Sequence, residues 1–220
     1  MAVQAGTFSI VAADPATGEV GCAVQSKYLA IGAVTPWVRA GVGAVATQAM
    51  GVVARNGDRV LSALAANVDP AAAIDQALSD DEGRELRQLG VVTDDGRAAA
   101  FTGRGCIEWA GHLVEAGLAV QGNMLASAEV VVAMRRVFLD LRAPMVERLM
   151  AALEAGQAAG GDRRGQQAAA LVVEQFGAAE HAPERIDRTC DLRVDDHPEA
   201  IVELRRLVSL WRQRREQRGS

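Results

Sequence analysis

The most informative segment of this 220-residue chain is Thr7-Phe-Ser-Ile-Val-Ala-Ala-Asp-Pro-Ala-Thr-Gly-Glu-Val-Gly-Cys-Ala-Val-Gln-Ser-Lys27. Residues 7–13 and 19–27 are apolar runs of strand length and predict two strands. Residues 14–18 between them have the composition of a turn, because proline presets its own φ and glycine is free to adopt a positive φ. The segment therefore predicts an antiparallel hairpin.

The turn also predicts which residues of the hairpin face each other. If the chain reverses over residues 14–18, Ala13 lies opposite Val20. Counting back from this pair places Thr7 opposite Ser26 or Lys27, at the end of the sheet away from the turn. A threonine hydroxyl and a lysine ammonium are therefore expected to be neighbours on adjacent strands.

The rest of the chain divides into blocks of strands and blocks of helices. Asp94-Asp-Gly96 is a strong hairpin signal, and Asp69-Pro70 is an N-cap followed by a proline at the first helical position. The expected strands are 41–49, 88–93, 97–101, 118–125, 168–173 and an edge strand at 191–194. The expected helices are 57–66, 70–79, 128–154 with a break or kink before Pro144, and a last helix that starts at residues 196–198.

This order of elements favours an α+β fold. It lacks the regular strand–helix alternation of a doubly wound parallel sheet. Aromatic residues are only 4 % of the chain, so small side chains must build the core and let the layers pack closely. We expect two largely antiparallel sheets packed face to face with helices outside, in one domain over residues 1–220.

Composition argues against several classes of function. A net charge of −5 and a pI near 5.3 argue against a nucleic-acid partner. No apolar run approaches the roughly 18 residues of a membrane-spanning helix, and the first residues lack the features of a signal peptide. Cys22, Cys106 and Cys190 are odd in number and far apart, which argues against a disulfide framework and favours the cytoplasm.

The cations of the chain are strongly biased. Of its 23 basic residues, Lys27 is the one lysine and the others are arginines. Lysine is a compact point charge whose pKa can shift, whereas arginine stays protonated. Lys27 is therefore a candidate for a specific chemical role, and chance survival of one surface lysine is the alternative.

The chain resembles the N-terminal-nucleophile (Ntn) hydrolases, the superfamily of the proteasome β subunits. More closely, it is similar to a bacterial family of uncharacterised proteins assigned to that superfamily. The residues that carry the resemblance are Thr7-Phe-Ser-Ile-Val-Ala, Asp14-Pro-Ala-Thr-Gly18, Ser26-Lys27, Pro36–Gln48, Arg87-Gln-Leu-Gly-Val, Gln121-Gly-Asn123, Gly160-Gly-Asp-Arg-Arg-Gly-Gln166 and Asp191–His197. The resemblance implies a four-layer αββα sandwich in which a Thr, Ser or Cys begins the first strand and a lysine lies near it.

The implied activity is amide-bond hydrolysis with Thr7 as the nucleophile and Lys27 tuning the site. A free N-terminal amine on the threonine can act as its base. Residues 1–6 precede Thr7 as a short propeptide or leader, and Gly6–Thr7 resembles the Gly–Thr bond that proteasome β subunits cleave in themselves. The alternatives are an inactive binding or scaffold protein with Thr7 blocked by residues 1–6, and an enzyme of this fold that needs no free N-terminus.

Other residues are candidates for the same end of the sheet. Asn123 ends an expected strand and is a candidate oxyanion donor, with a turn asparagine as the alternative. Ser26 and Gln48 could line the site, and Asp162 and Arg163 lie in a glycine-rich loop suited to an anionic group, or to a plain turn.

We expect no cofactor, and His112, His181 and His197 lack metal-ligand spacing. The expected partner is a small-molecule or short acylated, peptide-like substrate. A homo-oligomer is expected because related sandwiches often assemble.

Overall fold

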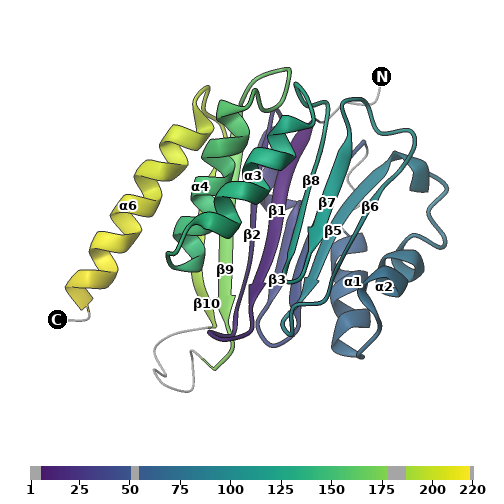
Figure 1. Cartoon of the computed structure of the whole chain (residues 1–220), viewed down its shortest axis with the longest axis horizontal. Coiled ribbons are helices and arrows are strands. Elements are labelled where there is room, and N and C mark those ends of the chain that lie inside the picture. Colours follow the sequence, from purple (N-terminus) through teal and green to yellow (C-terminus); the bar gives the residue numbers. More distant parts are fainter. Residues whose placement is uncertain (1–5, 51–54, 178–186, 219–220) are drawn as a thin grey trace.

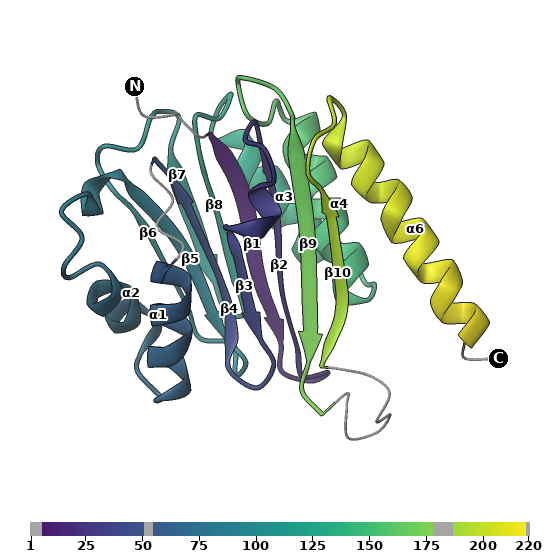
Figure 2. The same cartoon turned by 180° about the vertical axis from the view of Figure 1, so that it is seen from behind.

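Two antiparallel sheets form the centre of the molecule (Figures 1 and 2). The computed structural model describes residues 6–50, 55–177 and 187–218. The larger sheet has the order β10-β9-β2-β1-β8-β7 and the smaller one the order β3-β4-β5-β6. The strands are β1 Thr7–Asp14, β2 Glu19–Ser26, β3 Pro36–Arg39, β4 Gly43–Ala49, β5 Arg87–Thr93, β6 Ala98–Thr102, β7 Gly111–Glu115, β8 Leu118–Asn123, β9 Ala168–Gln175 and β10 Arg188–Val194.

Helices cover the outer faces of the two sheets (Figures 1 and 2). The α-helices are α1 Arg55–Ala65, α2 Pro70–Ala77, α3 Glu129–Asp140, α4 Met145–Ala158 and α6 Ala200–Arg218, with short 3-10 turns at Ile31–Ala33 and Arg84–Leu86. Helices α1 and α2 pack on the smaller sheet, and α3, α4 and α6 pack on the larger one. The mixed α+β class with two antiparallel sheets is therefore confirmed.

Strand β1 shows how alternating side chains serve two cores. Phe8 and Ile10 point toward α3 and α4, where they join a large cluster of apolar side chains. Val11 and Ala13 point the other way and pack against the smaller sheet. Because successive side chains of a strand alternate between faces, Thr7 also lies on the face that meets the other sheet. This alternation places the predicted nucleophile between the sheets.

The first hairpin is confirmed together with its register. Ala13 lies opposite Val20 and Thr7 lies opposite Ser26, which resolves the choice between Ser26 and Lys27. The second hairpin, β5–β6, is also confirmed.

The expected helix breaks and caps also appear. The segment expected to be helical over 128–154 is broken between α3 and α4, and Pro144 is the cap of α4. The Asp69 side chain accepts hydrogen bonds from the first turn of α2.

Two strands were not expected from the sequence. Strands β3 and β7 are short and lie at the edges of their sheets. Strand β10 is an edge strand, as expected, but starts three residues earlier than the predicted position 191. Among the described residues, no helix has the length and apolar character needed to cross a lipid bilayer.

Candidate functional site

A set of buried polar side chains fills one end of the space between the sheets. The members, here called the inter-sheet polar cluster, are Thr7, Ser9, Ser26, Gln48, Gln88, Gln121 and Asn123, and none is more than 2 % exposed. They come from the ends of β1, β2, β4, β5 and β8, because Thr7 pairs with both Ser26 and Asn123 while Gln48 pairs with Gln88. Strand pairing therefore brings Thr7, Ser26 and Asn123 together, and packing of the smaller sheet on the larger one adds Gln48, whose Nε2 lies 3.5 Å from the Thr7 carbonyl oxygen.

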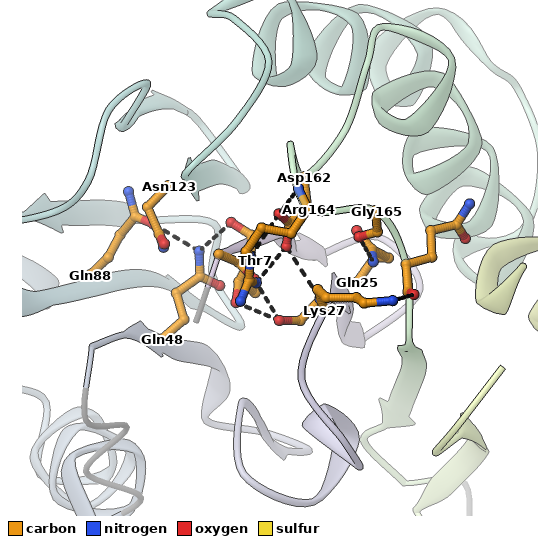
Figure 3. Close-up of polar contacts among 12 residues, drawn as sticks. Thr7, Gln25, Lys27, Gln48, Gln88, Asn123, Asp162, Arg164 and Gly165 are labelled. Carbon is orange, nitrogen blue, oxygen red and sulfur yellow. Dashed lines mark hydrogen bonds and ion pairs between the residues drawn. The ribbon is translucent and has the colours of Figure 1, made fainter. Parts of the chain in front are cut away.

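Gln88 is the centre of the amide network in this cluster (Figure 3). Its side-chain oxygen accepts hydrogen bonds from Gln48 Nε2 at 2.8 Å and from Asn123 Nδ2 at 2.9 Å. Its own Nε2 donates to the Gly122 carbonyl at 2.8 Å and to Thr102 Oγ1 at 3.0 Å. The network fixes the two amides beside Thr7, so Asn123 is held in place by one of the two N–H groups of its amide.

Thr7 belongs to a chain of hydroxyl groups that leads back to its own peptide bond. Thr7 Oγ1 donates to Ser26 Oγ at 3.1 Å, and Ser26 Oγ donates to the carbonyl oxygen of Gly6. Thr7 is fully buried. The hydroxyl of Thr7 and the carbonyl of the preceding residue are thus connected through one serine.

A second donor reaches the same carbonyl. Arg164 Nη2 lies 2.7 Å from the oxygen of Gly6. The guanidinium is held by Asp162, whose buried carboxylate receives Arg164 Nη2 at 2.6 Å and Nε at 3.1 Å. Asp162 also accepts the backbone N–H groups of Lys27 and Arg164. The carbonyl of the Gly6–Thr7 bond therefore faces a positive charge that a buried carboxylate positions.

Lys27 does not take the place expected of it. Its ammonium donates to the carbonyl oxygen of Gln166 at 3.1 Å, its side chain is exposed, and it extends away from Thr7 (Figure 3). The expectation that this ammonium lies within reach of the Thr7 hydroxyl is corrected by this placement. The physical reason is that Ser26, not Lys27, is opposite Thr7, and neighbouring side chains along the chain point to opposite sides.

The loop of residues 160–165 contributes a different arginine from the one predicted. Arg163 is exposed and its guanidinium donates to the carbonyl oxygen of Glu108 rather than to that of Gly6. Arg164 is the residue that reaches the Gly6 carbonyl. Asp162, expected to bind substrate, instead has its carboxylate occupied by Arg164 and two backbone N–H groups. Its role in this structure is to position Arg164.

Three cluster members were missed by sequence reasoning. Ser9 donates to Gln48 Oε1 at 2.6 Å and accepts from Gln121 Nε2 at 2.6 Å, and Gln88 joins the network described above. A signal for them was present. Ser9 is two residues after Thr7 and so shares its face, while Gln88 directly precedes an apolar run and Gln121 directly follows one.

The other nucleophilic side chains are poor candidates. Burial raises the pKa of the Cys106 thiol to about 11 and that of Cys190 to about 12, and it raises the pKa of Cys22 further still. A thiol acts as a nucleophile through its thiolate, so these three side chains stay protonated near neutral pH. Within the described part of the chain, no cluster of three or more His, Cys, Asp or Glu side chains is arranged to hold a metal. His181 lies outside the described residues, as do residues 1–5.

Comparison with known proteins places this chain in a family. The profile of a "Family of unknown function (DUF1028)" matches residues 7–204. The crystal structure of the DUF1028 protein SPO2555 from Silicibacter pomeroyi is similar, with a TM-score of 0.84 and 33% sequence identity. The similarity covers 93% of this chain and 85% of that one. No curated protein shows a significant sequence match.

Proposed function

This chain belongs to the DUF1028 family of unknown function, and we propose that it is an amide-bond hydrolase of the Ntn type. Thr7 is the nucleophile, and it becomes active when the Gly6–Thr7 bond is cleaved. Two antiparallel sheets with helices on both outer faces, and a threonine that begins a central strand, support assignment to the αββα sandwich of that superfamily. Fold alone does not fix a reaction, so the proposal rests on the site.

One observation carries the proposal: the Gly6 carbonyl receives hydrogen bonds from both Ser26 and Arg164, beside the hydroxyl of Thr7. Two donors on a carbonyl oxygen stabilise the negative charge that develops when its carbon is attacked. The Thr7 hydroxyl is within reach of that carbon by covalent geometry, because Gly6 and Thr7 are consecutive residues. The arrangement is suited to an intramolecular attack.

The self-cleavage step balances without an outside base. Thr7 Oγ1 bonds to the Gly6 carbonyl carbon, its proton passes to Ser26 Oγ, and the proton of Ser26 passes to the carbonyl oxygen. When this intermediate collapses, the C–N bond between Gly6 and Thr7 breaks and that proton moves to the Thr7 nitrogen. The product is an ester between Gly6 and Thr7 Oγ1. Water hydrolyses the ester and releases residues 1–6 with a terminal carboxylate.

Cleavage also supplies the base for later turnovers. The new α-amine of Thr7 has an ordinary pKa of roughly 7.7–8.0. The neutral form of this amine can accept the proton of Thr7 Oγ1. The hydroxyl attacks the acyl carbon of an amide substrate, the amine returns the proton to the leaving nitrogen, and water hydrolyses the acyl ester. The substrate we propose is a small or short acylated molecule, because Thr7 is fully buried in the uncleaved chain.

Intact mass of the purified full-length chain tests the proposal. We expect progressive loss of residues 1–6 on incubation, retained cleavage in Thr7→Ser, and a full-length mass throughout in Thr7→Ala. Cleavage of Thr7→Ala at the same bond would indicate a contaminating protease. A parent chain that stays full length after long incubation would contradict the proposal and favour the non-catalytic scaffold, in which Thr7 remains buried.

A further inference from the structure

The Gly6 position has no room for a side chain. A Cβ atom built on Gly6 in the L configuration lies 2.7 Å from Met124 Cβ and 3.0 Å from each carboxylate oxygen of Asp162. Non-bonded carbon atoms are in optimal contact at about 3.5–4.0 Å, so the contact with Met124 is a clash. The residue on the acyl side of the Gly6–Thr7 bond must therefore lack a Cβ.

The atoms that close this space are held in place. The backbone of Met124 donates its N–H to the Ile107 carbonyl at 2.8 Å, and its carbonyl accepts the Arg163 N–H at 3.0 Å. Asp162 is fixed by Arg164 and by the Lys27 N–H. The clashing atom of Met124 is its Cβ, which cannot move away by rotation of the side chain. The surface that Met124 Cβ and the Asp162 carboxylate present to Gly6 is therefore rigid.

The ester formed by self-cleavage is itself an acyl-enzyme. Its acyl group is a glycyl residue bound to Thr7 Oγ1, with its carbonyl oxygen between Ser26 and Arg164. A substrate attacked by the same hydroxyl must place its carbonyl oxygen on the same two donors. Its α-carbon then lies where the α-carbon of Gly6 lies, and a substituent in the L side-chain position meets Met124 Cβ.

We propose that the acyl site is selective for glycyl groups, and that Met124 Cβ is the atom that excludes L-aminoacyl groups. This inference rests on the proposed hydrolase activity and names its substrate class: amides in which the acyl residue is glycine. The acyl site also accepts a glycine that is substituted on its nitrogen, because the nitrogen of Gly6 itself is bonded to residue 5 in the intact protein.

Two positions of the chain allow a matched test. Met124 has a φ of +54°, a conformation that glycine adopts without strain, so Met124→Gly removes the Cβ and leaves a favourable backbone. Met124→Ala removes the rest of the side chain and keeps the Cβ. The two variants therefore separate the Cβ contact from a general loss of packing, and thermal melts of both establish that they fold.

The experiment measures the rate at which Thr7 of the processed protein is acylated by the p-nitrophenyl esters of N-acetylglycine and N-acetyl-L-alanine. Each acylation rate is divided by the rate at which hydroxide hydrolyses the same ester, which corrects for the intrinsic reactivity of the two esters. We expect the parent and Met124→Ala to prefer the glycyl ester by about tenfold or more, the scale at which a pocket discriminates one methyl group. Met124→Gly should reduce this preference severalfold. Likewise, Gly6→Ala should slow self-cleavage, and Gly6→Ala combined with Met124→Gly should restore it.

The outcomes separate the two proposals. Equal acylation by both esters in the parent, with the ester on Thr7 by peptide mass, overturns the glycyl selectivity and leaves the hydrolase standing. A preference that Met124→Gly does not change overturns the role of the Met124 Cβ. Absence of acylation at Thr7 by either ester, in a parent that also stays full length, overturns both.

Discussion

The two ends of the space between the sheets are equally buried and chemically opposite. One end is filled by small apolar side chains, among them Val11, Cys22, Ala44 and Val92. The other end holds the inter-sheet polar cluster. Burial of apolar groups stabilises the fold, whereas buried polar groups must recover in hydrogen bonds what they lose in hydration. The apolar end is explained by stability alone, and the polar end needs a further reason.

Hydrogen bonds at the polar end replace most, but not all, of the hydration that its side chains lose on burial. Gln88 uses both its oxygen and its nitrogen in several hydrogen bonds. Gln121 Oε1 has no hydrogen-bond partner among the described residues. A network that is only partly satisfied is less stable than an apolar layer of the same volume. Its position around Thr7 supports a role in holding the proposed nucleophile and its neighbours in place.

The largest effect is expected from Arg164, the charged residue at the polar end. Arg164→Gln removes the positively charged guanidinium that donates to the Gly6 carbonyl. We expect release of residues 1–6 to slow by about 10²-fold, as for loss of one oxyanion donor. Arg163→Gln is the matched control, because Arg163 is the neighbouring arginine and donates to the Glu108 carbonyl instead of the Gly6 carbonyl. Lys27→Gln is a second control for charge. Intact mass measures the cleavage rate of each variant. If the rate falls equally in all three variants, the cause is a general effect of charge and not the contact of Arg164 with the Gly6 carbonyl.

The second-largest effect is the loss of unfolding free energy caused by one substitution at each end of the space between the sheets. Gln88→Leu removes the hydrogen bonds that the Gln48 and Asn123 amides and the Gly122 carbonyl make with the Gln88 side chain, and we expect a loss of about 2–4 kcal/mol of unfolding free energy. Val11→Ala at the apolar end should lose about 2 kcal/mol through reduced burial and a small cavity.

Denaturant unfolding measures both changes, and the cleavage rate distinguishes them. Gln88→Leu should also slow the release of residues 1–6, because Gln48 and Asn123 flank Thr7. Val11→Ala should cleave at nearly the parent rate. A Gln88→Leu protein that is as stable as the parent and cleaves normally would show that the cluster is dispensable.

The fold was predictable from the sequence where local chemistry fixes geometry. The turn at residues 14–18 sets the register of the first hairpin, and Pro144 separates α3 from α4. Strands β3 and β7 escaped prediction because they are short edge strands, and pairing with a neighbour defines them more than their own sequence does.

The site was predictable only along the strands. Thr7, Ser26 and Asn123 lie at the ends of paired strands, and Gln48 lies at the end of a strand in the sheet that packs against them. The direction of Lys27 depends on a single residue of register, since one step reverses the side of the sheet. The choice between Arg163 and Arg164 depends on a loop with positive φ at its glycines, and such a loop has no period from which side-chain direction can be predicted.

The smallest expected effect concerns the edge of the polar end, where His112 contacts Thr102. Thr102 Oγ1 lies 2.8 Å from His112 Nδ1 and accepts a hydrogen bond from Gln88 Nε2, so its own proton is available to donate to an unprotonated Nδ1. Partial burial lowers the pKa of His112 below its ordinary value of 6.5. The unfolded chain therefore binds more protons than the folded one between the two pKa values.

The contribution of His112 to the free energy of unfolding is therefore fully present at pH values above the ordinary histidine pKa. It is lost as the pH falls from that value toward the lower pKa of the folded protein. The effect is small because His112 is only partly buried and remains largely accessible to solvent at the sheet edge. His112→Gln should lower the slope of unfolding free energy against pH between pH 5 and 7, while Thr102→Val should lower stability at pH 7 more than at pH 5. Parallel pH profiles for the parent and His112→Gln would show that the polar end does not sense the protonation of this histidine.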